Sequence, residues 1–155
     1  MIGPSRLGML PGRRSGPGQA LAEFALVAPF FFLLLFGIVE AGRFMFYYQV
    51  LNNATREGAR YAIVNGANSF NCTGPPAPTT DQPCDPSGED VKERVRQAAF
   101  GVLGSGVSVA PTWDPDNGRG STVTVAATYS YNSLIPIVPL PPITVEAESS
   151  LVINN

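Results

Sequence analysis

An uninterrupted apolar run with a carboxylate at each end constrains this chain most. The sixteen residues from Phe24 to Val39, FALVAPFFFLLLFGIV, contain no charged side chain, and Glu23 and Glu40 flank them. A helix of about 20 apolar residues crosses a bilayer, so we predict a membrane segment at about residues 20–42. A carboxylate taken into hydrocarbon costs roughly 2.5–3.5 kcal/mol. Glu23 therefore needs a partner or a place at the membrane surface.

The helical pattern continues past the membrane segment. Tyr47, Leu51, Ala54, Gly58 and Tyr61 recur at spacings of four and three, which predicts a narrow buried seam on one helix face. One helix over residues 19–64 would be about 69 Å long, more than twice the roughly 30 Å of a hydrocarbon core. Its second half must therefore lie outside the bilayer and pack against other structure.

The rest of the chain predicts a small α+β domain. The segment SGEDVKERVRQAAFGVLG reads as a second helix with Ser87 as its N-cap. Its expected buried stripe consists of Val91, Val95, Ala98, Ala99, Val102 and Leu103. Strand patterns follow at residues 107–113, 121–131 and 143–153, and DPDNGRG is a turn signal between the first two. We expect a three-stranded antiparallel sheet laid on the helical segments.

Composition divides the chain into four parts. Residues 1–18 hold three arginines, five glycines and three prolines, which is typical of a cytoplasmic leader. The helix at 19–64 follows, then a Pro-rich loop flanked by cysteines at 65–86. We assign residues 87–155 to an α+β domain.

Charge and residue types argue against several function classes. Beyond the leader, seven basic and twelve acidic side chains give −5, so the body is a poor match for nucleic-acid phosphate. The chain has no histidine, the commonest general base and metal ligand. Acids are scattered and no nucleophile has a base at motif spacing, so we expect no enzyme, no cofactor and no small-molecule substrate.

The DPDNG turn superficially resembles the start of a calcium loop. Asp114, Asp116 and Asn117 fit that opening, but Gly118 stands where a third ligand belongs and no glutamate closes the loop. We expect no metal site here.

Cys72 and Cys84 are the only cysteines, and they flank TGPPAPTTDQP. If this part is exported, we expect a disulfide that stabilises the fold by on the order of 3 kcal/mol. Two free thiols are the alternative.

Counting from Gly18 gives Glu23 a possible partner. Cleavage between Gly18 and Gln19 would make Glu23 the fifth residue, one helical turn from a new ammonium group. Opposite charges about 4 Å apart interact by roughly 4 kcal/mol at an effective dielectric of 20, which is comparable with the insertion cost. Three alternatives are open: the amine belongs to the same chain, it belongs to a neighbouring subunit, or Glu23 lies at headgroup level.

These residues carry a family resemblance. GQALAEF looks like the type III leader junction of type IV pilins and pseudopilins. EFALVAPFFFLLLFGIVEAGR followed by LNNATREGARYA resembles the N-terminal region of TadE-like proteins, the minor pilin-like components of tight-adherence (Flp) pili. The residues that carry the match are Gly18, Gln19, Glu23, Phe24, Pro29, Gly37, Glu40, Gly42, Arg43, Arg56, Glu57, Gly58 and Arg60.

The resemblance implies a role and a location. A membrane-embedded prepilin peptidase would cut after Gly18, and the mature chain would help to assemble or anchor the pilus with other pilin subunits and the assembly machinery. It would be a single-pass protein of the cytoplasmic membrane, with its N-terminus inside and its body outside. The positive-inside bias alone is weak, because Arg43 and Arg56 oppose the three leader arginines.

A different reading is a secreted or signal-anchored binding domain unrelated to pili. VEA at residues 39–41 has small or apolar residues where signal peptidase prefers them, and cleavage there would release a domain beginning at Gly42. Glu23 and Pro29 would then have no special purpose.

Overall fold

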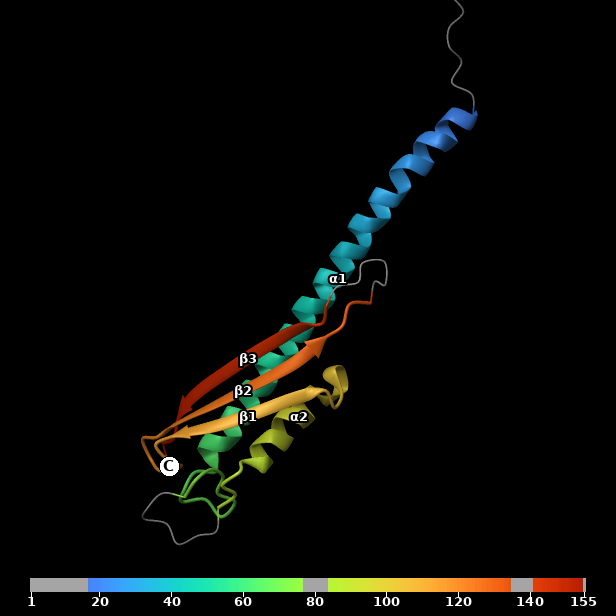
Figure 1. Cartoon of the computed structure of the whole chain (residues 1–155). Helices are drawn as coiled ribbons and strands as arrows, with labels where there is room; N and C mark the ends of the chain where they lie inside the picture. The colour runs from blue at the N-terminus through green and yellow to red at the C-terminus, as the bar shows by residue number, and fades with distance from the viewer. Residues whose placement is uncertain (1–16, 77–83, 135–140, 155) are drawn as a thin grey trace, which may run out of the picture. The chain divides into compact units, whose positions relative to one another are not determined.

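The computed structural model describes residues 17–76, 84–134 and 141–154 (Figure 1). Its elements are, in chain order, α1 (Pro17–Val64), α2 (Glu89–Leu103), β1 (Val107–Asp114), β2 (Thr122–Tyr131) and β3 (Ile143–Val152). The chain forms two compact units, one up to Ile38 and one from Val39 onward. The predicted α+β class, with a long N-terminal helix, is confirmed.

The first unit contains the apolar part of α1. Side chains there are almost all exposed, among them Phe24 at 69% and Phe30 at 71%. The helix has the length and composition to cross a membrane, and none of its most apolar stretch is buried. This supports single-pass membrane anchoring, because a helix that is apolar all round needs either a protein core or lipid around it. Residues 1–16 of the predicted leader lie outside the described residues.

The second unit is built on an antiparallel sheet in the order β1-β2-β3. Val109 pairs with Ala127, and Ala127 pairs with Ala147, so these three side chains share the inner face of the sheet. That face carries the buried residues of each strand, whereas Thr124 pairs with Ser150 on the other, polar face. The predicted alternation is therefore confirmed.

Both helices contribute to one core on the inner face of the sheet. From α1 come Leu51, Ala54, Ala59 and Ala62, which are at most 1% exposed, and Tyr47 and Tyr61 are partly buried beside them. From α2 come Val91, Val95, Ala99 and Leu103. The seam predicted for α1 is confirmed, and it is what holds the second half of α1 to the domain.

The stripe predicted for α2 was too wide. Ala98 and Val102 are exposed, because α2 buries one row of residues spaced four apart and both lie on the flank beside that row.

The start of α2 differs from the prediction as well. Gly88, not Ser87, is the N-cap residue, and no side chain of its own caps the helix. Instead the carboxylate of Asp85 accepts hydrogen bonds from Ser87 Oγ at 2.6 Å and from the backbone N–H of Asp90 at 3.3 Å. Burial raises the pKa of Asp85, but the hydrogen bonds from Ser87, Asp90 and Glu89 outweigh it and hold this pKa below its ordinary value.

Candidate assembly and membrane-anchoring site

The predicted processing and pairing residues lie at the start of α1. Gly18 and Gln19 are helical and exposed, and they are the second and third residues of the helix that begins at Pro17. Gln19 Nε2 donates a hydrogen bond of 3.2 Å to Glu23 Oε1. The residue that would become the new N-terminus therefore lies one turn from the carboxylate, as the predicted pairing requires. Whether an amine pairs with Glu23 stays a prediction.

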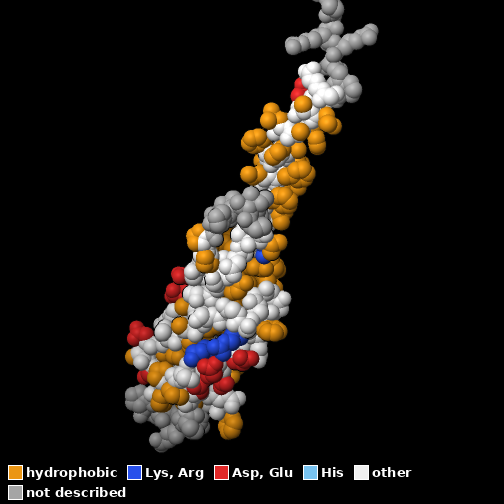
Figure 2. Space-filling model, turned by 45° about the vertical axis from the view of Figure 1, so that its right-hand side comes forward, with side chains coloured by type: hydrophobic (Ala, Val, Ile, Leu, Met, Phe, Trp, Pro, Cys, Tyr) orange, Lys and Arg blue, Asp and Glu red, His pale blue; other side chains and the backbone are white. Residues whose placement is uncertain are grey.

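The apolar surface continues from Phe24 along the helix. Figure 2 shows this part of α1 covered with hydrophobic side chains. Pro29 lies inside α1, and the helix runs through it. An added Cβ at Gly37 or Gly42 would meet nothing within 4 Å, so no described side chain requires a glycine at either position.

Glu40 directly follows the apolar run, and its carboxylate makes several polar contacts. Its carboxylate accepts hydrogen bonds from Tyr131 Oη at 2.7 Å and from the Leu134 backbone N–H at 3.1 Å. Arg43 Nη1 approaches the second carboxylate oxygen at 3.1 Å. The side chains of Glu40 and Arg43 are 19% and 27% exposed. Glu40 thus joins α1 to the end of β2.

Aromatic rings surround this ion pair. The Arg43 guanidinium lies 5.6 Å from the ring centroids of both Tyr47 and Tyr131. Tyr47 packs edge-to-face against Tyr131 at 5.5 Å and Tyr129 at 5.9 Å. Burial, together with the hydrogen bond to Glu40, raises the pKa of Tyr131 to about 12. The sequence interpretation missed Tyr131, although the alternation in β2 places it on the inner face.

In the REGAR segment, Glu57 and Gly58 contact α2, whereas Arg56 and Arg60 are exposed. Glu57 forms an ion pair with Arg94 of α2 at 3.1 Å, and the Arg94 guanidinium lies 6.0 Å from the ring centroid of Tyr61. A Cβ at Gly58 would collide with Val95 of α2, so the glycine permits close packing of α1 and α2. Arg56 and Arg60, four residues apart, are exposed on the same helix face.

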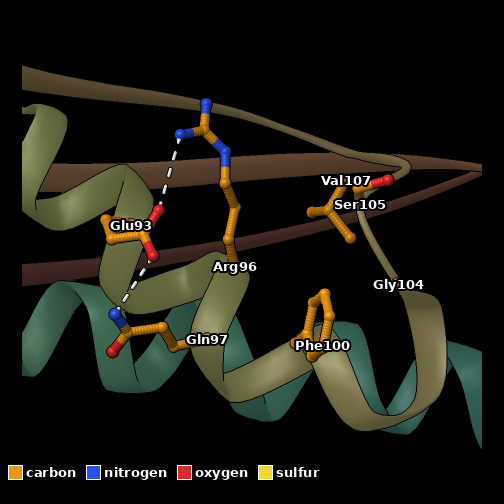
Figure 3. Close-up of a pocket in the computed structure, with 7 residues that line it drawn as sticks. All are labelled: Glu93, Arg96, Gln97, Phe100, Gly104, Ser105 and Val107. Carbon is orange, nitrogen blue, oxygen red and sulfur yellow. Dashed lines mark hydrogen bonds and ion pairs between the residues drawn. The ribbon is translucent and has the colours of Figure 1, made fainter.

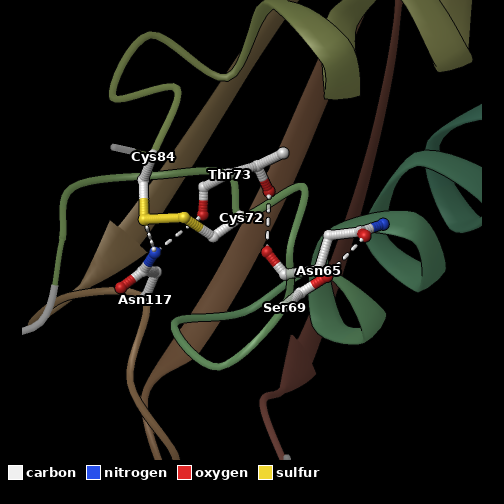
Figure 4. Close-up of a disulfide and its surroundings, with 6 residues drawn as sticks. All are labelled: Asn65, Ser69, Cys72, Thr73, Cys84 and Asn117. Atoms are coloured by element: carbon white, nitrogen blue, oxygen red, sulfur yellow. Dashed lines mark hydrogen bonds between the residues drawn. A yellow bond between two sulfur atoms is a disulfide. The ribbon is translucent and has the colours of Figure 1, made fainter. Parts of the chain in front are cut away.

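The disulfide between Cys72 and Cys84 is present, with the two Cα atoms 4.7 Å apart (Figure 4). Residues 77–83 of the loop that it closes lie outside the described residues. Beside the disulfide, Asn117 is fully buried, and its side chain donates to the Thr73 carbonyl at 3.2 Å and to Cys84 Sγ at 3.4 Å. The turn between β1 and β2 is thereby tied to the cysteine loop.

The same turn shows what its acidic residues do. Asp116 Oδ1 accepts hydrogen bonds from the Gly118 backbone N–H at 2.7 Å and from Ser121 Oγ at 2.8 Å. Within the described residues, no group of three or more potential metal ligands lies close together. These carboxylate contacts stabilise the turn itself.

An open groove of about 700 Å³ lies beside the C-terminal end of α2 (Figure 3). The Phe100 ring, 67% exposed, points toward Val107 at the start of β1. Three polar side chains of the groove interact with one another: Glu93 accepts a hydrogen bond from Gln97 at 3.0 Å and forms an ion pair with Arg96 at 3.9 Å. Figure 2 shows charged side chains of both signs gathered on the domain.

Together these features define a membrane-anchored α+β protein whose long N-terminal helix carries the candidate assembly residues. In comparisons with known proteins, the model of the TadE-like protein family matches residues 18–60. The resemblance predicted from the sequence is confirmed over this segment, which relates the chain to membrane proteins of the tight-adherence pilus system. No curated protein and no solved structure matched.

Proposed function

We propose that this chain is a non-enzymatic, minor pilin-like subunit that helps to assemble or anchor a tight-adherence (Flp-type) pilus. The observation that carries the proposal is the family match over residues 18–60, which includes the leader junction, the apolar helix and the REGAR segment. The exposed apolar surface of α1 supports it, because lipid or the helices of other subunits would cover such a surface. Its partners are then a prepilin peptidase, other pilin subunits, the assembly machinery and membrane lipid.

Maturation gives Glu23 its role in this proposal. A prepilin peptidase cuts after Gly18, and the new amine at Gln19 lies one turn from Glu23. In lipid, an unpaired carboxylate favours docking against the amine of a neighbouring subunit in register. Glu23 would therefore align adjacent subunits.

The disulfide supports an extracytoplasmic location for the domain. Disulfides persist in oxidising compartments and are rare in the cytosol. A Cys72–Cys84 bridge is thus consistent with the domain outside the cytoplasmic membrane and the leader inside.

The contacts of Glu40 weaken the reading as a cleaved, secreted domain. Signal-peptidase cleavage after Ala41 would remove Glu40 and leave the partly buried Tyr131 hydroxyl and the Leu134 N–H without their acceptor. A fold that uses Glu40 to join α1 to β2 favours retention of the whole helix.

The proposal is tested in cells by replacing the chromosomal copy with variants and examining pili. Deletion of the chain should abolish or strongly reduce piliation. Glu23→Ala should leave expression and cleavage unchanged but impair incorporation and piliation, because the pairing charge is lost. The matched control is Glu148→Ala, which removes an exposed carboxylate of β3 and should behave as the parent does. Normal pili in the deletion strain would overturn the proposal, and normal pili with Glu23→Ala would overturn the pairing role.

A further inference from the structure

Four exposed apolar side chains lie at one end of the second unit. Leu134 is 71% exposed, Met45 56%, Phe46 54% and Ile143 46%. We call these four residues the apolar collar. Leu134 follows β2, Ile143 begins β3, and the other two belong to α1. A small domain in water gains nothing by exposing four large apolar side chains at one end, and exposed apolar surfaces mark contact sites.

Described contacts hold the collar at the point where the apolar run ends. The Leu134 N–H donates to Glu40, and Ile143 pairs with Tyr131, whose hydroxyl donates to the same carboxylate. Met45 and Phe46 follow Glu40 by about 8–9 Å of helix rise. Figure 1 shows the end of β2 and the start of β3 beside this part of α1. The collar therefore lies beside the residue that directly follows the apolar run.

The length of the run leaves room for the collar at the membrane surface. Sixteen helical residues from Phe24 to Val39 span about 24 Å, whereas the hydrocarbon core is about 30 Å thick. The interfacial layers add a further 5–8 Å or so on each side. Residues just after Val39 are thus expected at the depth of the hydrocarbon boundary and the headgroups.

The polar groups around Glu40 suit a position at the boundary between hydrocarbon and headgroups. Glu40 is paired with Arg43 and hydrogen-bonded to Tyr131 and Leu134, so its charge does not need bulk water. Tyrosines are enriched where a protein crosses the membrane interface, and the rings of Tyr47 and Tyr131 lie against Arg43 of this pair.

We propose that the apolar collar lies in the interfacial layer of the bilayer that α1 crosses, so that the domain rests on lipid through Met45, Phe46, Leu134 and Ile143. The covalent continuity of α1 with the apolar run favours lipid over other occupants. The inference rests on the membrane anchoring included in the proposed function but not on a role in pili.

The test uses the full-length chain in vesicles of phosphatidylcholine and phosphatidylglycerol. The wild-type cysteines are both in the disulfide, so a new cysteine can be labelled alone with an environment-sensitive nitrobenzoxadiazole dye. Labels are placed in Leu134→Cys, in Leu34→Cys within the apolar run, and in Phe70→Cys. Phe70, which is 92% exposed, is the water-facing control. It lies near Ala67, whose N–H donates to Asn117 in the turn before β2. The length of β2 separates this turn from Tyr131 by roughly 30 Å. Quenching is measured with doxyl lipids whose spin label lies either near the glycerol backbone or deep in the chain.

The proposal predicts blue-shifted emission and strong quenching at position 134 by the shallow lipid, several-fold more than at position 70. Quenching equal to that at position 70 would overturn it. Blue-shifted emission without quenching by either lipid would also overturn it, because a second protein would then cover the collar. Strong quenching at position 34 by the deep lipid tests anchoring separately. If position 34 is quenched and position 134 is not, only the collar proposal fails.

A second variant keeps the test independent of folding. Ile143→Asp, in the chain labelled at position 134, should reduce quenching there because a charge introduced into the collar draws this end of the domain away from the lipid. Ile143→Leu is the matched control and should leave quenching unchanged. A far-UV circular dichroism spectrum equal to that of the parent reports that each variant has folded. Equal quenching with aspartate and leucine would contradict the proposal.

Discussion

The phenol of Tyr131 donates a hydrogen bond of 2.7 Å to the carboxylate of Glu40, across 91 positions of the sequence. This bond joins the last residue of β2 to α1 directly after the apolar run. It fixes where the sheet of the domain begins along α1. Glu40 is therefore a structural residue of the domain as well as the boundary of the predicted membrane segment.

Tyr131 should ionise late in an alkaline titration. Burial and the bond to Glu40 raise its pKa to about 12, above the ordinary tyrosine value of about 10. A group whose pKa is raised on folding contributes stability that is present below its unfolded pKa, here about 10. That stability is lost as the pH rises through the folded value. Absorbance at alkaline pH should show a step near pH 12 that Tyr131→Phe removes, and an unchanged titration in this variant would contradict the assignment.

Gly58→Ala should destabilise the domain. The added Cβ collides with Val95, and overpacking of this kind costs about 1–3 kcal/mol. Urea unfolding of the full chain in detergent, followed by circular dichroism, measures the change. Gly42→Ala is the matched control in the same helix, where the Cβ meets nothing within 4 Å, and it should stabilise by about 0.5–1 kcal/mol.

The cause of the Gly58 effect is tested by a second substitution. If the clash with Val95 is responsible, the loss of stability in the double variant Gly58→Ala/Val95→Ala should be smaller than the sum of the losses in the two single variants. Additive losses would mean that Gly58 acts through something other than this contact.

Asp85→Asn should destabilise the start of α2 at neutral pH and have little effect in acid. The folded pKa of Asp85 is lowered, so its ionised form contributes stability that is present above the unfolded value of about 4. As the pH falls through the folded pKa, that contribution disappears. Thermal unfolding of wild type and Asp85→Asn should therefore differ most near pH 7 and converge as the pH falls below the folded pKa of Asp85. A difference that grows in acid would contradict the assigned role.

Reduction of the disulfide should cost on the order of 3 kcal/mol, because the two cysteines lie 12 positions apart and the crosslink restricts the unfolded chain. Urea unfolding with and without reductant measures the loss. Equal stability in both conditions, or thiols that alkylate without reductant in the native protein, would count against this role.

Features set by local patterns were predictable from the sequence. The periodicity from Gln19 onward predicted α1 to within two residues, and alternation in β2 and β3 predicted which of their faces is buried. The Cys72–Cys84 bridge followed from the presence of just two cysteines around a Pro-rich loop.

What the sequence did not show depends on contacts between distant residues or on small differences in geometry. Tyr131 was visible as an inward-facing residue, but nothing local says which turn of α1 it meets. Ser87 was predicted as the N-cap because serine is favoured there; its hydroxyl instead donates to Asp85, whose two carboxylate oxygens reach both Ser87 and Asp90. The proposed partner of Glu23 is an amine that exists only after cleavage, in the same chain or in a neighbouring subunit. This pairing therefore stays a prediction.

The mature N-terminus tests the central claim most directly. Intact mass and N-terminal sequencing of the chain from native membranes, with and without the prepilin peptidase, should show a start at Gln19 only when the peptidase is present. Gly18→Leu is the processing control and should leave the chain uncut. A start at Gly42, or an uncut chain in cells that contain the peptidase, would contradict the account.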